Sequence, residues 1–223
     1  LTYKHAKGED GTDIVPGLAK DLPEVSSDGK TYKLTLRPNM KYSDGTPIKA
    51  SDFTYAIQRL FKVDSGGSVF YGVIAGADDY ADGKADTISG IKTDDATGDI
   101  TVNLTEPNGT FDHILALPFA APVPPTTPLD KDATNNPPPS SGPFTITKVD
   151  APHTLTMERN PQFKTVKDAG ADEVADAHVD KIIVTQNKSN SAQVTGVQQN
   201  KIDFMTDPPD ADRLPEVKAR YGN

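Results

Sequence analysis

The sequence contains no cysteine and only four histidines among its 223 residues. The absence of cysteine excludes a disulfide framework and a thiolate metal site, but it does not decide the compartment. The histidines lie far apart, without the i, i+4 spacing that would place two zinc ligands on one helix face. They are His5, His113, His153 and His178. The residues therefore predict no metal site and no cofactor.

The usual signatures of catalysis are also missing. No G-x-S-x-G turn presents a serine nucleophile, and neither a P-loop nor a G-x-G-x-x-G loop is present to hold nucleotide phosphates. Carboxylates are plentiful, but sequence spacing alone cannot show that two of them form a catalytic pair. The residues thus indicate no catalytic group.

Positive charge and long apolar runs are scarce. Asp and Glu outnumber Lys and Arg by 32 to 23, which gives a formal net charge of -9. Such a surface repels phosphate backbones, and solubility explains it better than adaptation to cationic ligands. No apolar run approaches the roughly 20 residues that a membrane-spanning helix needs. We therefore expect neither nucleic acid as a partner nor a membrane span.

The hydrophobic share of 35% is low for a compact domain. It favours thin layers, long polar connections, or a piece of a larger protein. The ends favour the last interpretation, because the sequence starts at Leu1 without a signal peptide and stops at residues 221–223 without a closing element.

The stretch 42–61 gives the clearest structural prediction. The Asp44-Gly45 pair, followed by a proline two residues later, forces a turn. Ser51 is a suitable N-cap, and Asp52 places a negative charge in the first helical turn. An apolar stripe at helical spacing then predicts a core helix that ends before Gly66. The stripe consists of Phe53, Ala56, Ile57, Leu60 and Phe61.

Other elements before residue 118 follow from the same periodicities. Alternation of apolar and polar residues predicts half-buried strands at 32–36 and 100–104, and Ile88 and Ile91 flank a further short strand. Thr110 can cap a short helix at 110–115, which a short apolar face predicts. The segment 93–99 resembles a calcium loop, but Ala96 lacks a ligand oxygen and no Glu closes the motif. We interpret this segment as a hairpin turn.

A proline-rich connector at 118–143 is the best boundary in the chain, because its prolines bar regular structure. The elements expected after it are a hairpin at 144–157, a surface loop at 168–178, a buried strand at 182–184, a helix at 189–200 and a strand at 202–205. Composition and pattern together predict a mixed α and β protein.

Several segments, taken in order, resemble the bacterial extracellular solute-binding proteins of family 5, the peptide-binding components of ABC importers. The matching segments are Pro16-Gly17-Leu18-Ala19, Asp28-Gly29, Thr31-Tyr32, Leu36-Arg37, Tyr42 to Pro47 with Ala50, Asp52-Phe53 and Arg59, Ser141 to Phe144, Glu158 to Pro161 with Phe163, and Ile202-Asp203. No single segment is specific, but the ordered series spans nearly the whole chain.

Two positions depart from the family pattern. Asn200-Lys201 stands where relatives commonly carry Gly before the Ile-Asp pair, and Asn is the next residue best suited to a left-handed helix end. Lys164 stands where a Trp often follows the aromatic residue, which leaves the packing near Phe163 open.

The resemblance implies an α/β fold, an incomplete lobe of the type II periplasmic-binding-protein kind with an extra small α+β subdomain. Family members run to about twice this length, beyond the usual size of one domain. Residues 1–136 would form the extra subdomain of the first lobe, and residues 137–223 would form part of the core of that lobe. The second lobe would be absent.

The resemblance also implies binding rather than catalysis. The complete protein would close two lobes on a peptide or similar solute and deliver it to the membrane permease of an ABC importer. It would act as a monomer at the extracellular face of the membrane or in the periplasm, with a lipid anchor. The residues expected to face the cleft are Tyr71, Met205, Thr206 and Asp207. Their structural alternatives are core packing for the first two and a solvated loop for the others.

Two other functions stay open. A secreted hydrolase would need catalytic groups outside these residues, and an adhesion or scaffold module would need an exposed apolar patch, for which the run 69–74 is the candidate. The solute is also open, because relatives take peptides, nickel complexes, sugars and opines.

Overall fold

The computed structural model describes residues 1–172, 174–186 and 189–222. The chain divides into two compact units. Unit 1 consists of Leu1–Val149 and Thr156–Ile182, and unit 2 consists of Asp150–Leu155 and the residues from Ile183 onward. This division does not coincide with the proline-rich connector. The assignment of residues 1–136 and 137–223 to subdomain and lobe stays a prediction.

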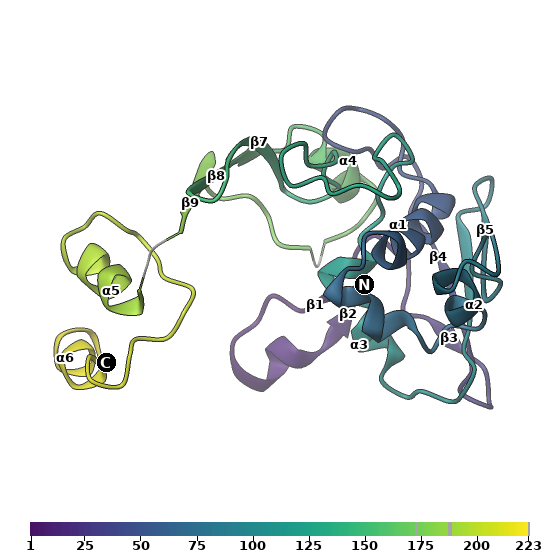
Figure 1. Ribbon diagram of the computed structural model, residues 1–223, viewed down its shortest axis with the longest axis horizontal. Coiled ribbons are helices and arrows are strands. Elements are labelled where there is room, and N and C mark those ends of the chain that lie inside the picture. Colours follow the sequence, from purple (N-terminus) through teal and green to yellow (C-terminus); the bar gives the residue numbers. More distant parts are fainter. Residues whose placement is uncertain (173, 187–188, 223) are drawn as a thin grey trace. The chain divides into compact units, whose positions relative to one another are not determined.

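Helices and strands are interspersed along the chain, which confirms the mixed α and β class (Figure 1). The strands are β1 (Thr2–Tyr3), β2 (Ile14–Val15), β3 (Glu24–Val25), β4 (Thr31–Thr35), β5 (Ile91–Asp94), β6 (Asp99–Asn103), β7 (Phe144–Asp150), β8 (Thr154–Arg159) and β9 (Lys181–Thr185). The α-helices are α1 (Ala50–Lys62), α2 (Ala77–Ala81), α3 (Phe111–Leu115), α4 (Phe163–Asp168), α5 (Asn190–Gln198) and α6 (Leu214–Tyr221), and the 3-10 helices are η1 (Gly8–Thr12), η2 (Gly66–Tyr71) and η3 (Pro118–Ala120).

An antiparallel sheet in the order β3-β4-β6-β5 forms the scaffold of unit 1. Tyr32 pairs with Val102 and Leu34 pairs with Ile100, so the alternating apolar residues share one face. The 93–99 segment is the hairpin turn between β5 and β6, as predicted, and Gly98 supplies its positive φ. The strand expected at 88–91 begins instead at Ile91.

The helix predicted after the turn is α1, and it ends at Lys62 as expected. It packs against the sheet and against η2, η3 and α2 (Figure 1). The prediction of Ser51 as N-cap is wrong, because the N-cap residue is Lys49. The carboxylate of Asp52 accepts the Lys49 backbone amide at 2.9 Å, whereas the Ser51 hydroxyl donates to Asp95.

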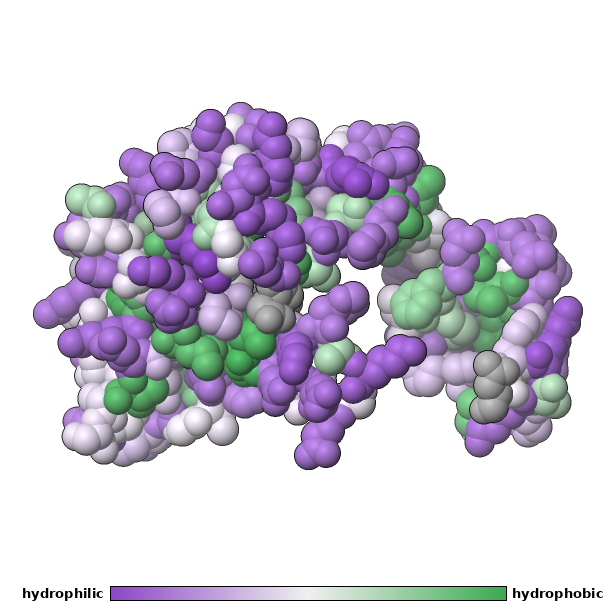
Figure 2. Space-filling model, turned by 180° about the vertical axis from the view of Figure 1, so that it is seen from behind, coloured by the Kyte–Doolittle hydropathy of each residue, from purple (hydrophilic) through white to green (hydrophobic). Residues whose placement is uncertain are grey.

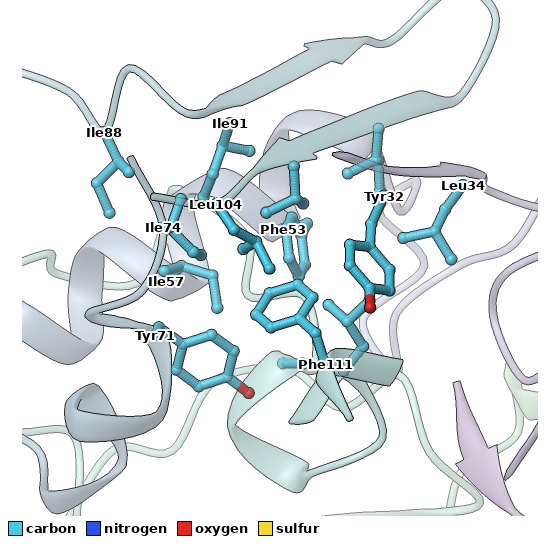
Figure 3. Close-up of a cluster of buried hydrophobic side chains, with 14 of the residues drawn as sticks. Tyr32, Leu34, Phe53, Ile57, Tyr71, Ile74, Ile88, Ile91, Leu104 and Phe111 are labelled. Atoms are coloured by element: carbon cyan, nitrogen blue, oxygen red, sulfur yellow. The ribbon is translucent and has the colours of Figure 1, made fainter. Parts of the chain in front are cut away.

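The main hydrophobic core lies between the sheet and the helices that cover it (Figure 3). Its labelled side chains come from β4, α1, η2, α3 and the segments around β5 and β6. A second cluster forms beside it from Met40, Tyr42, Ile48, Phe163, Val166 and Ala171. Phe163, whose packing the sequence left open, is therefore a core residue at the start of α4, a helix that the sequence pattern did not indicate.

A buried carboxyl group joins α1 to the turn that precedes it. Asp52 is 2% exposed, and its carboxylate accepts the Tyr42 hydroxyl at 2.8 Å as well as the Lys49 amide. Burial raises the pKa of Asp52, and the two hydrogen bonds oppose that effect. A carboxyl group with a raised pKa in the folded state binds its proton more readily there than in the unfolded chain. It therefore stabilises the fold at acid pH, and this contribution is lost as the pH rises through the folded-state pKa.

We therefore expect Asp52→Asn to change the pH dependence of stability. Between pH 7 and pH 4, the wild-type protein should gain free energy of unfolding relative to the variant as the pH falls. Urea unfolding at several pH values measures this difference. Asp86→Asn is the control, because Asp86 is exposed in the loop before β5. Parallel pH curves for wild type and Asp52→Asn would contradict the assignment.

The proline-rich connector behaves as expected. Between 118 and 143 the structure has only the three-residue helix η3. The hairpin predicted after it is present as β7 and β8. After the last residue of α4, the described residues of the 168–178 region, 169–172 and 174–178, are loop.

Three expectations for the last 45 residues need correction. The segment 202–205 is not a strand, because it pairs with no strand among the residues that the structure describes. The 182–184 segment lies in β9 as predicted, but it is not buried, since Ile183 is 61% exposed. Residues Leu214–Tyr221 form helix α6, for which the sequence analysis predicted no element. Helix α5 is confirmed, and the Ser189 hydroxyl caps it by accepting the Ala192 amide.

Candidate functional site

The four residues predicted to face the cleft fall in different units. Tyr71 belongs to unit 1, and Met205, Thr206 and Asp207 belong to unit 2. The three residues of unit 2 follow one another on a single segment. Each group is therefore described within its own unit.

Tyr71 is the last residue of η2 and has no exposed surface. Its hydroxyl donates to the Ile114 carbonyl at 3.0 Å, and burial raises its pKa, so the hydroxyl keeps its proton at neutral pH. The ring lies in the main core (Figure 3). This placement matches the packing alternative, and a role in ligand contact stays a prediction.

The residues just before Tyr71 are exposed instead. Val69 is 74% exposed, and Phe70 stacks on Phe119 with 6.2 Å between ring centroids. Gly67 is required for this contact, because a Cβ atom there would lie 2.5 Å from the Phe119 ring. The apolar run 69–74 is therefore split, with its first two residues at the surface and Tyr71 and Ile74 in the core. Sequence reasoning missed Phe119, which lies 49 residues away from Phe70 and shares no motif with it.

The segment that carries the other three residues is anchored at its start by the end of α5. Asn200 takes a φ of 55°, and the amides of Lys201 and Ile202 both donate to the Gly196 carbonyl. The Ile202 side chain lies directly on Gly196, where a Cβ atom would be 2.5 Å from the Ile202 Cδ1. Asn200 thus takes the left-handed conformation at the helix end for which the sequence analysis judged Asn suited.

The far end of the segment is held by two side-chain amides of α5. Gln193 donates to the Asp207 carboxylate at 3.3 Å, and Asn190 donates to the Pro208 carbonyl at 3.2 Å. Between these anchors Met205 is half-buried, whereas Thr206 and Asp207 are exposed. Within the described residues, the backbone amides from 204 to 207 donate to no protein acceptor. Among the described residues these amides thus lack a protein acceptor, and the exposed Asp207 carboxylate accepts one hydrogen bond, from Gln193.

The described residues meet neither the requirement of a metal site nor that of a membrane-spanning helix. In the ranges that the structure describes, no group of three or more His, Asp or Glu side chains could hold a metal ion. In the same ranges, no helix is long and apolar enough to cross a membrane. Apolar residues reach the surface in patches between hydrophilic ones (Figure 2).

Residues 13–222 match the family described as bacterial extracellular solute-binding proteins, family 5 middle. A dipeptide-binding protein of Lactococcus lactis subsp. cremoris is 38% identical over 48% of this chain and 20% of its own length. A probable peptide ABC transporter periplasmic-binding protein, y4tO of Sinorhizobium fredii, is 30% identical over 87% of this chain and 35% of its own length.

Solved structures agree with this assignment. A clavulanic acid biosynthesis oligopeptide-binding protein superposes with a TM-score of 0.86 at 27% identity, over 98% of this chain and 40% of that protein. The unliganded open form of the periplasmic murein tripeptide-binding protein MppA shares the fold, with a TM-score of 0.79 at 23% identity. The chain spans well under half of the length of these proteins. The type II binding-protein fold is thereby confirmed, and the chain belongs to the bacterial extracellular solute-binding proteins of family 5, which are binding proteins rather than enzymes.

Proposed function

We propose that the complete protein binds a peptide between two lobes and delivers it to the membrane permease of an ABC importer. It acts as a monomer at the extracellular face of the membrane or in the periplasm, held there by a lipid anchor. The two lobes close on the ligand by a hinge motion, so that contacts from both sides form together.

The observation that carries this proposal is the family match over residues 13–222, joined to the names of the similar proteins. These names are those of dipeptide- and oligopeptide-binding proteins, and y4tO is named as the periplasmic-binding protein of a peptide transporter. They favour a peptide over the nickel complexes, sugars and opines that the family also takes.

The segment 204–207 suits this role physically. A peptide main chain carries carbonyl acceptors, which exposed backbone amides bind as a neighbouring strand would. The Asp207 carboxylate adds an acceptor for the amides or the amino group of a peptide. We therefore assign peptide contact to Met205, Thr206 and Asp207. Tyr71 reaches a ligand only where the segments that cover it move apart.

Calorimetry with a library of short peptides tests the proposal. The protein at the full length of its relatives should bind peptides, whereas the 223-residue chain should bind weakly or not at all. One lobe alone lacks the opposing contacts and the exclusion of water that closure provides. Nanomolar affinity of the 223-residue chain alone would contradict the two-lobe account.

A variant separates the assigned segment from the rest of the surface. In the full-length protein, Asp207→Ala should weaken peptide binding about 5- to 50-fold, because the substitution removes a charged hydrogen-bond acceptor that contacts the ligand. Asp203→Ala removes the same charge from an exposed position on the same segment and should leave the affinity within about twofold. Equal effects of the two variants would point to general electrostatics instead of contact.

A further inference from the structure

Unit 1 contains an apolar cavity of about 310 Å³ that the proposed peptide contacts do not use. Its wall comes from Leu1 and Thr2, the segment 18–19, β4 with Leu36, β6, α1, the end of α3 and the η3 region. Its large apolar side chains include those of Leu18, Leu34, Leu36, Phe53, Ile100 and Leu115. Leu34 and Phe53 line this cavity and also belong to the main core cluster (Figure 3). The cavity thus shares part of its wall with the core, and connecting segments around residues 18, 36 and 116–122 complete it.

The volume and lining match those of a small-molecule site. Ligand cavities usually begin at about 300 Å³ and combine an apolar wall with a few polar groups that orient the ligand. An apolar cavity of about half this volume already holds a benzene molecule. The cavity therefore has room for an aryl group or an alkyl chain of medium length.

One charged side chain, that of Lys49, lines this cavity. Lys49 is exposed, so it lies where the cavity meets solvent, and within the described part of the chain its ammonium group has no ion-pair partner within 4.0 Å. The Asp52 carboxylate, which lies nearby, is buried and bound to the Lys49 backbone amide and the Tyr42 hydroxyl. Lys49 therefore has its ammonium group available for an anion at the mouth of an apolar cavity.

We infer that this cavity binds a small amphipathic carboxylate, with its alkyl or aryl part against the leucines and its carboxylate at Lys49. The apolar part supplies most of the affinity, because burial of each methylene group removes apolar surface from water. The ammonium group selects an acid over the matching alcohol. This site is separate from the segment 204–207 and does not depend on peptide binding.

Isothermal titration calorimetry with decanoate, below its micelle concentration, tests the inference, with decanol as the uncharged probe. Decanoate should bind with one site per chain and more tightly than decanol. Lys49→Met keeps the aliphatic stem and removes the charge, so it should weaken decanoate binding about 2- to 5-fold and leave decanol binding unchanged. Absence of decanoate binding at millimolar concentration would overturn the inference.

Two further variants locate the ligand. Lys33→Met removes the same charge from the opposite face of β4, where side chains alternate, and should leave the decanoate affinity unchanged. Ala116→Phe places a ring into the cavity from its half-buried lining position and should abolish binding of both probes. Circular dichroism verifies that this variant is folded. Unchanged binding in folded Ala116→Phe, or equal losses in the two lysine variants, would place the ligand elsewhere.

Discussion

The variant Gly90→Ala should destabilise unit 1 by about 3 kcal/mol or more. Gly90 lies immediately before β5, where its amide donates to the Ala75 carbonyl at 2.7 Å and its carbonyl accepts the Asn103 amide at 2.8 Å. A Cβ atom at this position would lie 2.7 Å from both the Ala75 and the Asn103 carbonyl oxygens. Because these atoms belong to the backbone, they cannot rotate away, and the segments must separate at the cost of their hydrogen bonds.

Urea unfolding followed by tyrosine fluorescence measures the effect. The tyrosines of unit 1 are Tyr3, Tyr32, Tyr42, Tyr55, Tyr71 and Tyr80, whereas unit 2 contains Tyr221. Gly66→Ala is the matched control, because a Cβ atom there would have no neighbour within 4 Å. Its effect should stay within about 0.5 kcal/mol. Similar free energies of unfolding for the two variants would show that the close approach at Gly90 is not needed.

The contrast between Gly90 and Gly66 illustrates what the sequence could not predict. Each follows a serine, and neither stands in a turn motif that demands positive φ. What distinguishes Gly90 is the backbone of residues 75 and 103, which approaches it only in the folded chain. Contacts between segments distant in sequence leave no local pattern.

Local periodicity, in contrast, predicted elements well. The apolar stripe of α1 and the alternation in β4 and β6 each follow from residues a few positions apart. The N-cap was misassigned because Ser51 has the right chemistry for it, but Asp95, from the distant hairpin, binds both its amide and its hydroxyl. A residue suited to capping is not the cap when another part of the chain binds it.

Strand predictions fail where a strand's hydrogen-bonded neighbour, or the elements that pack on it, determine whether it forms or is buried. Residues 202–205 have the composition of a strand, but a strand also needs a neighbour that accepts its hydrogen bonds. In β9, composition indicated burial, yet Ile183 and Val184 are exposed. An apolar composition favours burial, but a strand is buried only where other elements pack on it.

The candidate site was predictable to different degrees in the two units. The resemblance selected Met205, Thr206 and Asp207, and these residues necessarily share one segment because they are consecutive in the sequence. The burial of Tyr71 depends on Ile114, which lies 43 residues further along the chain. The wall of the apolar cavity likewise combines segments near residues 18, 34, 53 and 115, which no spacing rule connects.

Truncation of a buried ring should have a comparably large effect. Phe111 has no exposed surface, and it meets Tyr32 edge to face with 5.1 Å between ring centroids. Phe111→Ala removes this contact and leaves a void between α3 and the sheet. The loss should be about 3–5 kcal/mol, the range found when a buried phenyl group is deleted. Urea unfolding of unit 1, followed by tyrosine fluorescence, measures it.

Phe70→Ala is the control for this prediction, because it deletes the same ring from the same unit. Phe70 is 42% exposed and touches Phe119 at the surface, so its loss should cost about 1 kcal/mol or less. The difference between the two losses of unfolding free energy measures the effect of burial, because both variants delete the same side chain. If Phe111→Ala cost no more than Phe70→Ala, then α3 would not be part of the cooperative core, and the packing of Tyr32 and Tyr71 against α3 would contribute little to the stability of unit 1.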